Sequence, residues 1–231
     1  GGGNGILRQL KLASIPLGSI HHFILTHAHC DHLLGVIWMV RKMGDLIMAG
    51  KYQGQLHIWC HESIIDAIRV MSEISLQKEH VKMLGTGILL HPITDGTEAE
   101  MLGCRIRFFD ILSSKLLQYG FTAEKEGWKL TCLGDEPYNP ACESVVRGSH
   151  WLLAEAFCLY GQRDIFKPYE KHHSTVMDAA KLAQELNVPN LVLWHTEDTN
   201  YDNRKELYTA EGKQYYSGNL FVPYDLEVID L

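Results

Sequence analysis

The spacing of apolar residues over the first ninety positions alternates between the periods of helices and strands. Residues 6–12 have helical spacing, and the apolar run at 20–26 predicts a buried strand. Apolar residues recur every three or four positions at 31–43 and 61–74, which predicts two helices, and residues 56–60 predict a short strand between them. The apolar surface of the helix at 31–43 is wider than a solvent-facing helix needs, so we expect it to pack against a sheet.

Short strands dominate the middle of the chain. Apolar runs predict strands at 88–90, 104–112, 115–122, 128–133, 150–156 and 191–194, with turns at 95–96 and 125–127. Helices are predicted at 176–187, which Ser174 or Thr175 can cap, and at 203–215, before last strands at 220–223 and 226–229. Helices and strands alternate over much of the length, but hairpins crowd the middle. We therefore expect a mixed sheet in an α+β fold.

Composition agrees with a globular protein. The chain has 231 residues, 46% hydrophobic and 21% charged, and no Pro/Ser/Gly-rich linker divides it, so we predict one domain over residues 1–231. The formal net charge of -7 argues against binding nucleic acid through the overall electrostatic field. Bound metal ions would nevertheless make a local pocket much more positive than that sum.

Cysteine usage and the lack of long apolar runs bear on the compartment. Six cysteines are scattered without a CxxC pair, which favours reduced thiols in the cytoplasm. No run of residues is long or apolar enough to cross a membrane, and no signal peptide is recognisable. We predict a cytoplasmic protein without a membrane partner. Because the chain begins without an initiator Met, we also expect the native protein to be longer.

Candidate chemistry is concentrated at residues 26–32, Thr-His-Ala-His-Cys-Asp-His. His27 and His29 alternate along an extended backbone and can point the same way, whereas Asp31 and His32 lie in a first helical turn and can face a second point. Four potential ligands wedged between apolar segments predict two adjacent metal ions; a merely polar surface loop is the alternative. Cys30 lies inside the motif, but we expect its side chain to point away.

Three more polar residues occupy the same kind of position, just beyond a strand or before a helix. Asp135 and His195 each follow a predicted strand, and His173 precedes a predicted helix. Because loops at strand ends commonly build active sites, we expect these side chains to gather around metal. Glu155 lies inside a predicted strand and is interpreted as a structural carboxylate. The remaining histidines, His61 at a helix start among them, are interpreted as structural or surface residues.

These motifs resemble those of a known family. Residues 26–32 match the HxHxDH signature of the metallo-β-lactamase-fold hydrolases, and Gly134-Asp135 and His195 match the later ligands in order. Within that superfamily the chain looks most like the ribonuclease Z branch, because of residues 5–10, His173-Ser174-Thr175 and Leu193-Trp194-His195. The resemblance implies a four-layer αββα sandwich, here apparently lacking its N-terminal strands.

The same resemblance implies a dinuclear metal site. Its six ligands would be His27 and His29 on the first metal, Asp31, His32 and His195 on the second, and Asp135 bridging the two. One further first-site histidine of the family falls at Leu112 here, and leucine cannot coordinate a metal. Asp110 could replace it only if a regular strand gave both residues the same face. Histidine and carboxylate ligands suit zinc, with manganese or iron possible.

We therefore predict a metal-dependent hydrolase of phosphodiesters, with Asp31 and His173 as catalytic residues. Two metals would lower the pKa of a bridging water for in-line attack, and His173 would act as general acid or hydrogen-bond donor beside the departing oxygen. The alternative for His173 is a role confined to capping the following helix. The expected substrate is a small phosphodiester or nucleotide.

Three alternatives stay open. Transfer-RNA 3′-end processing, and hence RNA as partner, is disfavoured because only a short hairpin fits between Leu112 and Asp135, where the tRNA-processing members carry a protruding arm. The second alternative is a hydrolase of a thioester, lactone or β-lactam on the same fold. The third is a degenerate metal-binding protein, made conceivable by Leu112. A homodimer is expected from the family resemblance.

Overall fold

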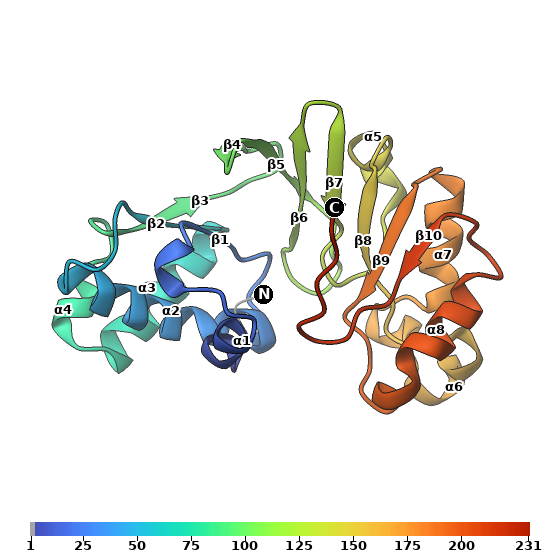
Figure 1. The fold of residues 1–231 in the computed structure, drawn as a ribbon, viewed down its shortest axis with the longest axis horizontal. Coiled ribbons are helices and arrows are strands. Elements are labelled where there is room, and N and C mark those ends of the chain that lie inside the picture. Colours follow the sequence, from blue (N-terminus) through green and yellow to red (C-terminus); the bar gives the residue numbers. More distant parts are fainter. Residues whose placement is uncertain (1–2) are drawn as a thin grey trace. The chain divides into compact units, whose positions relative to one another are not determined.

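The first three predicted strands pair side by side in a parallel sheet. In the computed structural model, which describes residues 3–231, they are β1 (His22–Ile24), β2 (Leu56–Cys60) and β3 (Ile88–Pro92), in the order β1-β2-β3 (Figure 1). They belong to the first of two compact units, which meet in sequence at Thr94 and Asp95. Each unit has its own sheet, and each is described separately.

Helices of the first unit cover the sheet through an apolar stripe. They are α1 (Ile6–Leu12), α2 (Cys30–Met48), α3 (Glu62–Ser75) and α4 (Lys78–Val81), with a short 3₁₀ turn at Leu17–Ser19. Val36, Met39, Val40 and Met43 recur at helical spacing along α2 and are all buried in one core with β2. The predicted end at residue 43 is too early, because Leu46 and Ile47 continue this packing.

The strand β2 explains which face of the first sheet is buried. Leu56, Ile58 and Cys60 alternate along it and are fully buried in the same core as α2 and α3. His57 and Trp59 lie between them on the opposite face and are only half-buried. The period of two therefore separates an apolar face under the helices from a face rich in aromatic and imidazole rings.

The second unit contains the mixed sheet that the sequence predicts. Its strands are β4 (Glu98–Met101), β5 (Cys104–Asp110), β6 (Tyr119–Lys125), β7 (Trp128–Cys132), β8 (Trp151–Glu155), β9 (Asn190–Trp194) and β10 (Asn219–Phe221). Their order is β10-β9-β8-β7-β6-β5-β4, parallel from β10 to β7 and antiparallel from β7 to β4.

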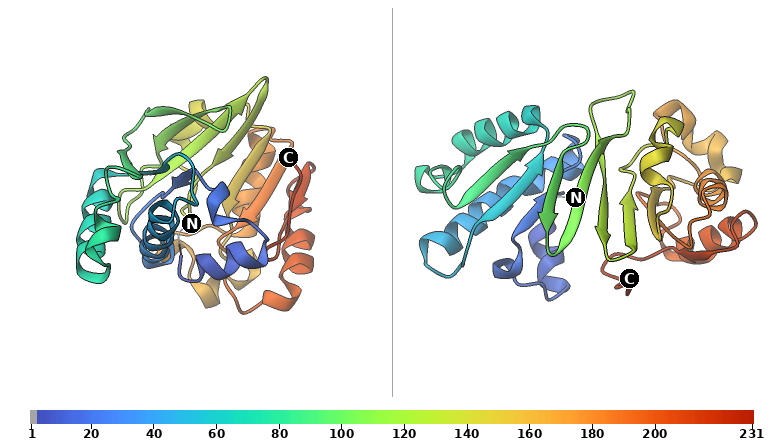
Figure 2. Two further views of the ribbon diagram at one scale, coloured as in Figure 1. Left: turned by 60° about the vertical axis from the view of Figure 1, so that its left-hand side comes forward. Right: turned by 90° about the horizontal axis from the view of Figure 1, so that it is seen from above.

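Helices of the second unit gather on one face of this sheet (Figure 2). They are α5 (Glu143–Val146), α6 (Arg163–Phe166), α7 (Val176–Glu185) and α8 (Arg204–Gly212), with 3₁₀ turns at Pro140–Cys142, Tyr160–Gln162, Tyr169–Lys171 and Tyr201–Asn203. Small side chains on α7, namely Ala179, Ala180 and Ala183, are buried in one core with Leu152 and Leu191 of the sheet. They allow the helix backbone to approach the strands closely.

Two strand predictions need correction, and one strand was missed. Residues 226–229 form no strand in the described chain: Leu226 has a left-handed φ of 68° and Val228 is exposed, so neither side chain has a partner to bury it. The strand predicted at 115–122 starts only at Tyr119, after a loop. The short strand β4 (Glu98–Met101), in which two glutamates alternate with Ala99 and Met101, was not predicted; it pairs with β5.

The predictions about domain count and location concern the whole molecule. Each unit contributes one sheet and one layer of helices, and the single domain over residues 1–231 stays a prediction. Within residues 3–231, no helix is both long and apolar enough to cross a lipid bilayer. All six cysteines are free thiols in the structure.

Candidate functional site

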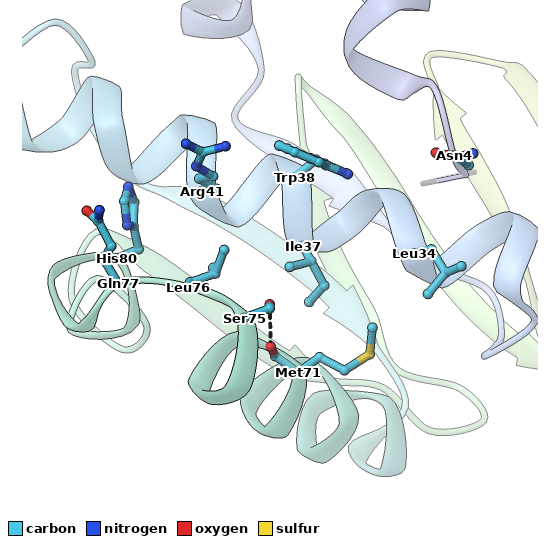
Figure 3. A pocket seen from close by; sticks show the side chains of 10 residues that line it. All are labelled: Asn4, Leu34, Ile37, Trp38, Arg41, Met71, Ser75, Leu76, Gln77 and His80. Atoms are coloured by element: carbon cyan, nitrogen blue, oxygen red, sulfur yellow. Dashed lines mark hydrogen bonds between the residues drawn. The ribbon is translucent and has the colours of Figure 1, made fainter.

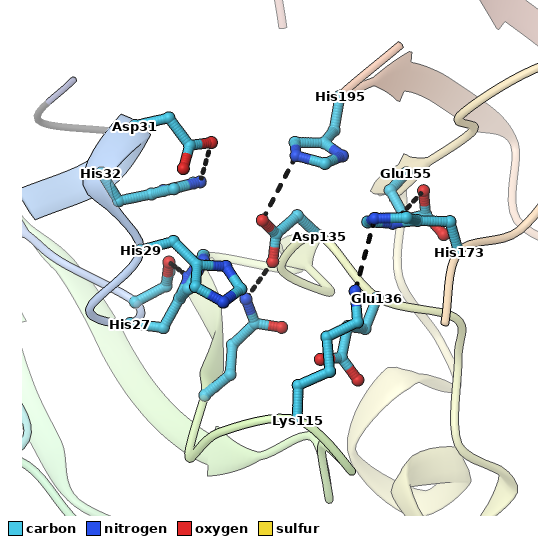
Figure 4. Close-up of polar contacts among 12 residues, drawn as sticks. His27, His29, Asp31, His32, Lys115, Asp135, Glu136, Glu155, His173 and His195 are labelled. Carbon is cyan, nitrogen blue, oxygen red and sulfur yellow. Dashed lines mark hydrogen bonds and ion pairs between the residues drawn. The ribbon is translucent and has the colours of Figure 1, made fainter. Parts of the chain in front are cut away.

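In the first unit, the motif at residues 26–32 brings its imidazoles together. The chain leaves β1 in an extended conformation, and α2 begins directly after His29. His27 Nε2 lies 2.9 Å from His29 Nδ1, and the rings of His27 and His32 are 4.1 Å apart (Figure 4). The Thr26 hydroxyl lies 3.0 Å from His27 Nδ1, which directs the Nε2 atom of this fully buried ring toward its partners.

Asp31 belongs to the same cluster through His32. Its Oδ2 atom lies 3.3 Å from His32 Nε2, at the first turn of α2. The carboxylate is also favoured there by the partial positive charge of the helix N-terminus. Four side chains of the predicted ligand set thus converge within this unit, whereas Cys30 is exposed and belongs to none of the metal-compatible clusters of the described chain.

In the second unit, Asp135 and His195 face each other. Asp135 follows β7 and is 3% exposed, and its Oδ2 lies 3.3 Å from Nε2 of His195, which follows β9. Gln118 donates a hydrogen bond from Nε2 to the other oxygen of Asp135. Gly134 makes this approach possible, because it has a φ of 78° and a Cβ atom there would lie 3.0 Å from the Gln118 side chain.

His173 is held by a buried carboxylate that the sequence interpretation did not assign to the site. His173 Nδ1 lies 3.5 Å from Oε2 of Glu155, and the ring stacks on Phe157 with centroids 4.8 Å apart. Glu155 also accepts a hydrogen bond from the Ser174 amide. Burial raises the pKa of the Glu155 carboxyl, and the facing His173 and Ser174 groups offset only part of that effect.

Glu155 could have been recognised as a site candidate by its position in the sheet, and not by its neighbours in sequence. Glu155 is the last residue of β8 and pairs in register with Trp194, the residue before His195. Glu155, His173 and His195 consequently offer ligand atoms that all lie within 4.8 Å of one another. A rule that treats any buried acid at the end of a parallel strand as a site candidate would have found it.

A loop after β5 adds polar groups beside His173. Lys115 Nζ lies 3.3 Å from Nε2 of His173 (Figure 4). In the same loop, Ser114 Oγ lies 2.7 Å from Nδ1 of His172. Lys115 was not selected from the sequence, because a lone exposed lysine has no distinguishing neighbours.

The position of the missing histidine lies at the start of this loop. Leu112 is 51% exposed and has a left-handed φ of 60°, so the regular strand has already ended at Asp110. Asp110 Oδ1 accepts a hydrogen bond from the Leu112 amide at 2.7 Å. Its carboxylate therefore serves the local turn, and the condition under which Asp110 could replace the histidine, a regular strand through 112, is not met.

Other histidines have the structural roles that the sequence predicts. His61 caps α3 by accepting a hydrogen bond from the Ser63 amide at 3.2 Å, and His80 Nε2 lies 2.8 Å from Oδ1 of Asp45. The hydrogen bond from His80 lowers the pKa of the Asp45 carboxyl.

One further concavity lies in the first unit, between α2 and the segment from α3 to α4 (Figure 3). This cavity has a volume of about 570 Å³, and its walls are mainly the apolar side chains of Leu34, Ile37, Trp38, Met71 and Leu76. It contains none of the predicted catalytic residues, so it is not the candidate hydrolytic site.

The donor groups fit divalent metal ions. Imidazole nitrogens and carboxylate oxygens are common ligands of zinc, and His27, His32 and Asp135 are buried. His29 and His195 are partly buried, and the Asp31 carboxylate is exposed. Thr26 on His27 and Gln118 on Asp135 are the supporting contacts that orient metal ligands in proteins. The residues present in the two clusters are thus compatible with bound divalent metal ions.

The family follows from comparison with known proteins. Residues 3–196 match the model of the beta-lactamase superfamily domain, and the chain belongs to that family. It is similar to ribonuclease Z of Methanothermobacter thermautotrophicus, with 26% identity over 93% of this chain and 81% of the relative. Ribonuclease Z of Salinispora arenicola is 20% identical over 99% of this chain and 85% of its own length.

Solved structures have the same fold. The metallo-beta-lactamase fold protein YhfI from Bacillus subtilis matches with a TM-score of 0.77 and 16% identity, covering 96% of this chain and 82% of that one. The short form of human tRNase Z matches with a TM-score of 0.73 and 19% identity, covering 99% and 85%. The predicted family resemblance, α+β fold and hydrolase class are thereby confirmed at the level of the superfamily.

Proposed function

We propose that this protein hydrolyses a small phosphodiester or nucleotide with the help of two divalent metal ions. The observation that carries the proposal is the pairing of His173 with the buried Glu155, 3.5 Å apart, next to His195. Such a pair fixes the orientation of an imidazole for proton transfer. Relatives support the choice of bond, since they are ribonuclease Z proteins, and one solved structure of this fold is that of a diphosphatase from the PhnP family, with a TM-score of 0.67.

The proposed metal ligands are those that the resemblance implies. His27 and His29 would hold one ion, Asp31, His32 and His195 the other, and Asp135 would be shared. When bound, the ions would supply Lewis acidity and lower the pKa of a coordinated water. Zinc is our first choice, supported by its presence in a solved structure of this fold, PqqB from Methylobacterium extorquens, which matches with a TM-score of 0.68. Manganese and iron are alternatives.

Residues of the chain itself would orient the imidazole and transfer the proton. Glu155 faces Nδ1 of His173, which leaves Nε2 as the atom that can transfer a proton. When the phosphorus–oxygen bond breaks, its electron pair stays on the leaving oxygen, and His173 Nε2 gives that oxygen a proton. Asp31 keeps its proposed catalytic role as a carboxylate that faces His32 and would anchor one ion.

A metal-reconstituted assay with an aryl phosphodiester tests this proposal. We expect turnover by the parent protein and a loss of about 100-fold or more in His173→Ala at unchanged metal content. His150→Ala is the matched control, because His150 accepts a hydrogen bond from the Lys129 amide in an exposed position and has no role in the proposal. Equal rates in His173→Ala and the parent would contradict the catalytic role.

RNA is the second candidate substrate. The relatives named ribonuclease Z and the similarity to human tRNase Z favour it. The segment between Leu112 and Asp135 weighs against it, since it holds only a loop and the β6–β7 hairpin, and the net charge of -7 weighs the same way. Cleavage of a tRNA precursor more efficiently than a small phosphodiester, compared by kcat/KM, would reverse this order.

Simple measurements distinguish the proposed phosphodiesterase from the two other functional alternatives, a hydrolase of another bond and a degenerate metal-binding protein. A panel of a thioester, a lactone and a chromogenic β-lactam beside the phosphodiester would reveal a different bond specificity. Metal analysis tests whether the protein is a degenerate metal-binding protein. Two equivalents of metal per chain together with turnover would exclude that alternative.

We also propose a homodimer. On α2, Leu34 and Trp38 are each 46% exposed at the edge of the apolar cavity between α2 and the segment from α3 to α4, and a second copy could cover them. Light scattering should give twice the chain mass for the parent and the single mass for Trp38→Arg. A monomeric parent would contradict the proposal.

A further inference from the structure

The loop after β5 is anchored at several points, so its side chains have defined positions. Ser113 Oγ donates a hydrogen bond to Glu136 Oε1 at 2.6 Å and accepts one from the Lys115 amide at 3.2 Å and one from the Leu116 amide at 3.3 Å. The next residue, Ser114, contacts His172 at 2.7 Å. The backbone at Lys115 is therefore fixed from both sides.

The side chain of Lys115 runs from this loop to the outward-facing nitrogen of His173. Its ammonium lies 3.3 Å from His173 Nε2, while the other ring nitrogen faces Glu155. Among the described residues, the partner of the Lys115 ammonium is this imidazole and not a carboxylate. The ammonium can therefore also bind an anion next to His173 Nε2, the atom to which we assign proton transfer.

The Lys115 ammonium and His173 Nε2 lie 3.3 Å apart in the exposed loop region, so an oxygen anion bound beside the imidazole is within reach of the ammonium. The ammonium would give that oxygen a charge-assisted hydrogen bond. A phosphoryl group carries such oxygens, whereas an ester or thioester carbonyl does not carry a full negative charge. The position of Lys115 therefore discriminates between substrate classes.

We propose that Lys115 binds a non-bridging phosphoryl oxygen of the substrate and thereby favours phosphoesters over uncharged esters. The inference rests on the proposed phosphoesterase function and assigns it a specificity residue. Lysine acts here as a point charge on a flexible stem, so Arg can replace it in part.

The test compares Lys115→Met and Lys115→Arg with the parent. For an aryl phosphodiester we expect Lys115→Met to raise KM about tenfold while kcat changes less than about threefold, since a lost charge-assisted hydrogen bond acts on binding. The affinity for inorganic phosphate, measured by titration calorimetry on metal-loaded protein, should fall about tenfold as well. Lys115→Arg should retain values within about threefold of the parent.

Two controls make the result specific. Lys78→Met removes the same charge from an exposed position on α4 and should leave KM and phosphate affinity unchanged. Metal content and circular dichroism of all variants should equal those of the parent. An unchanged KM and an unchanged phosphate affinity in Lys115→Met would overturn the inference.

Failure of the proposed function has a different signature. A parent protein that hydrolyses an uncharged ester but no phosphoester would overturn that function. Phosphate titration would still report on Lys115, because binding is measured without turnover. A change of kcat alone, with phosphate affinity intact, would also overturn the binding role.

Discussion

At the scale of single residues, His173 depends on a carboxylate that is almost completely shielded from water. Glu155 is 2% exposed, and its two oxygens are divided between the Ser174 amide and the imidazole. The carboxyl oxygen that faces Nδ1 limits how the His173 ring can turn. The orientation of the proposed proton donor is therefore set by one neighbour.

Glu155→Gln tests this dependence. Glutamine keeps the shape and can still accept from the Ser174 amide, but it removes the charge, so we expect kcat on an aryl phosphodiester to fall about 10- to 100-fold. The double variant with His173→Ala should be no slower than His173→Ala alone, because the two residues act as a unit. Additive losses would mean that Glu155 acts independently of His173.

Leu112 raises the question of whether one metal site is incomplete. Its φ of 60° is a conformation that histidine adopts more readily than leucine, so Leu112→His suits the backbone. We expect the variant to retain more metal per chain after dialysis, measured by elemental analysis, and to turn over faster. Leu112→Asn is the matched control, because asparagine also accepts this φ but is a poor metal ligand. Equal metal content in all three proteins would indicate that another residue completes the shell.

The sequence predicts candidate site residues at strand ends but not the groups that contact them. His27, Asp135 and His195 are recognisable because they follow apolar runs within a known signature. Gln118 and Lys115 are not, since each reaches its partner across a loop whose shape depends on tertiary contacts. Side-chain pairing between distant positions leaves no periodicity in a single sequence.

At the scale of elements, the position of His173 depends on how α7 begins. Thr175 and Asp178 form a capping box, in which the Thr175 hydroxyl and amide both contact the Asp178 carboxylate, at 2.6 and 2.9 Å. This box ends the loop that carries His173 and Ser174. The helix start thus fixes the end of the loop that carries the proposed proton donor, as well as satisfying backbone groups.

Thr175→Ala should weaken stability and activity together. Loss of the cap costs about 1 kcal/mol, which corresponds to a melting temperature lower by about 2–4 °C, and a less ordered loop should also reduce kcat. Thr175→Ser keeps the hydroxyl and should stay close to the parent. A lower melting temperature with an unchanged kcat would show that the loop is positioned by other contacts.

Elements with strong local signals were predicted well, and elements that exist through pairing were not. The helix at Ile6–Leu12 and the strand at Leu56–Cys60 have the predicted bounds, because their apolar spacing and flanking breaks act locally. The strand β4 exists through its register with β5, and residues 226–229 lack any such partner despite their alternation. Pairing is a tertiary property that alternation alone does not encode.

Helix α2 also contains a titratable contact with a defined pH dependence. The hydrogen bond from His80 lowers the pKa of Asp45, so the folded state binds the Asp45 proton less tightly than the unfolded state. The resulting stabilisation is present above the unfolded pKa and disappears as the pH falls through the folded value, below about pH 4.

Asp45→Asn should therefore lower stability at pH 7 and narrow its gap to the parent as the pH falls below about 4. Urea unfolding at a series of pH values measures this difference. Asp66→Asn, at an exposed position of α3, is the control and should track the parent. A gap that stays constant down to pH 3 would contradict the linkage.

At the scale of the whole molecule, the proposed ligands come from both compact units, with His27 in the first and His195 in the second. Metal that binds the folded chain and not the unfolded chain raises the melting temperature by mass action. At a free concentration about 100 times the dissociation constant, the gain in stability is about 2.7 kcal/mol. We therefore expect a chelator to lower the melting temperature and added zinc to restore it.

Two variants decide whether both units contribute ligands to metal binding. His27→Ala and His195→Ala each remove a proposed ligand from one unit, so each should reduce the zinc-dependent rise in melting temperature and the metal retained per chain. His91→Ala, in β3, removes an imidazole outside the proposed ligand set and should leave the zinc response intact. A side chain affects only the ion that it binds. If one variant lost the zinc-dependent rise in melting temperature and the other kept it in full, the metal ligands would come from a single unit.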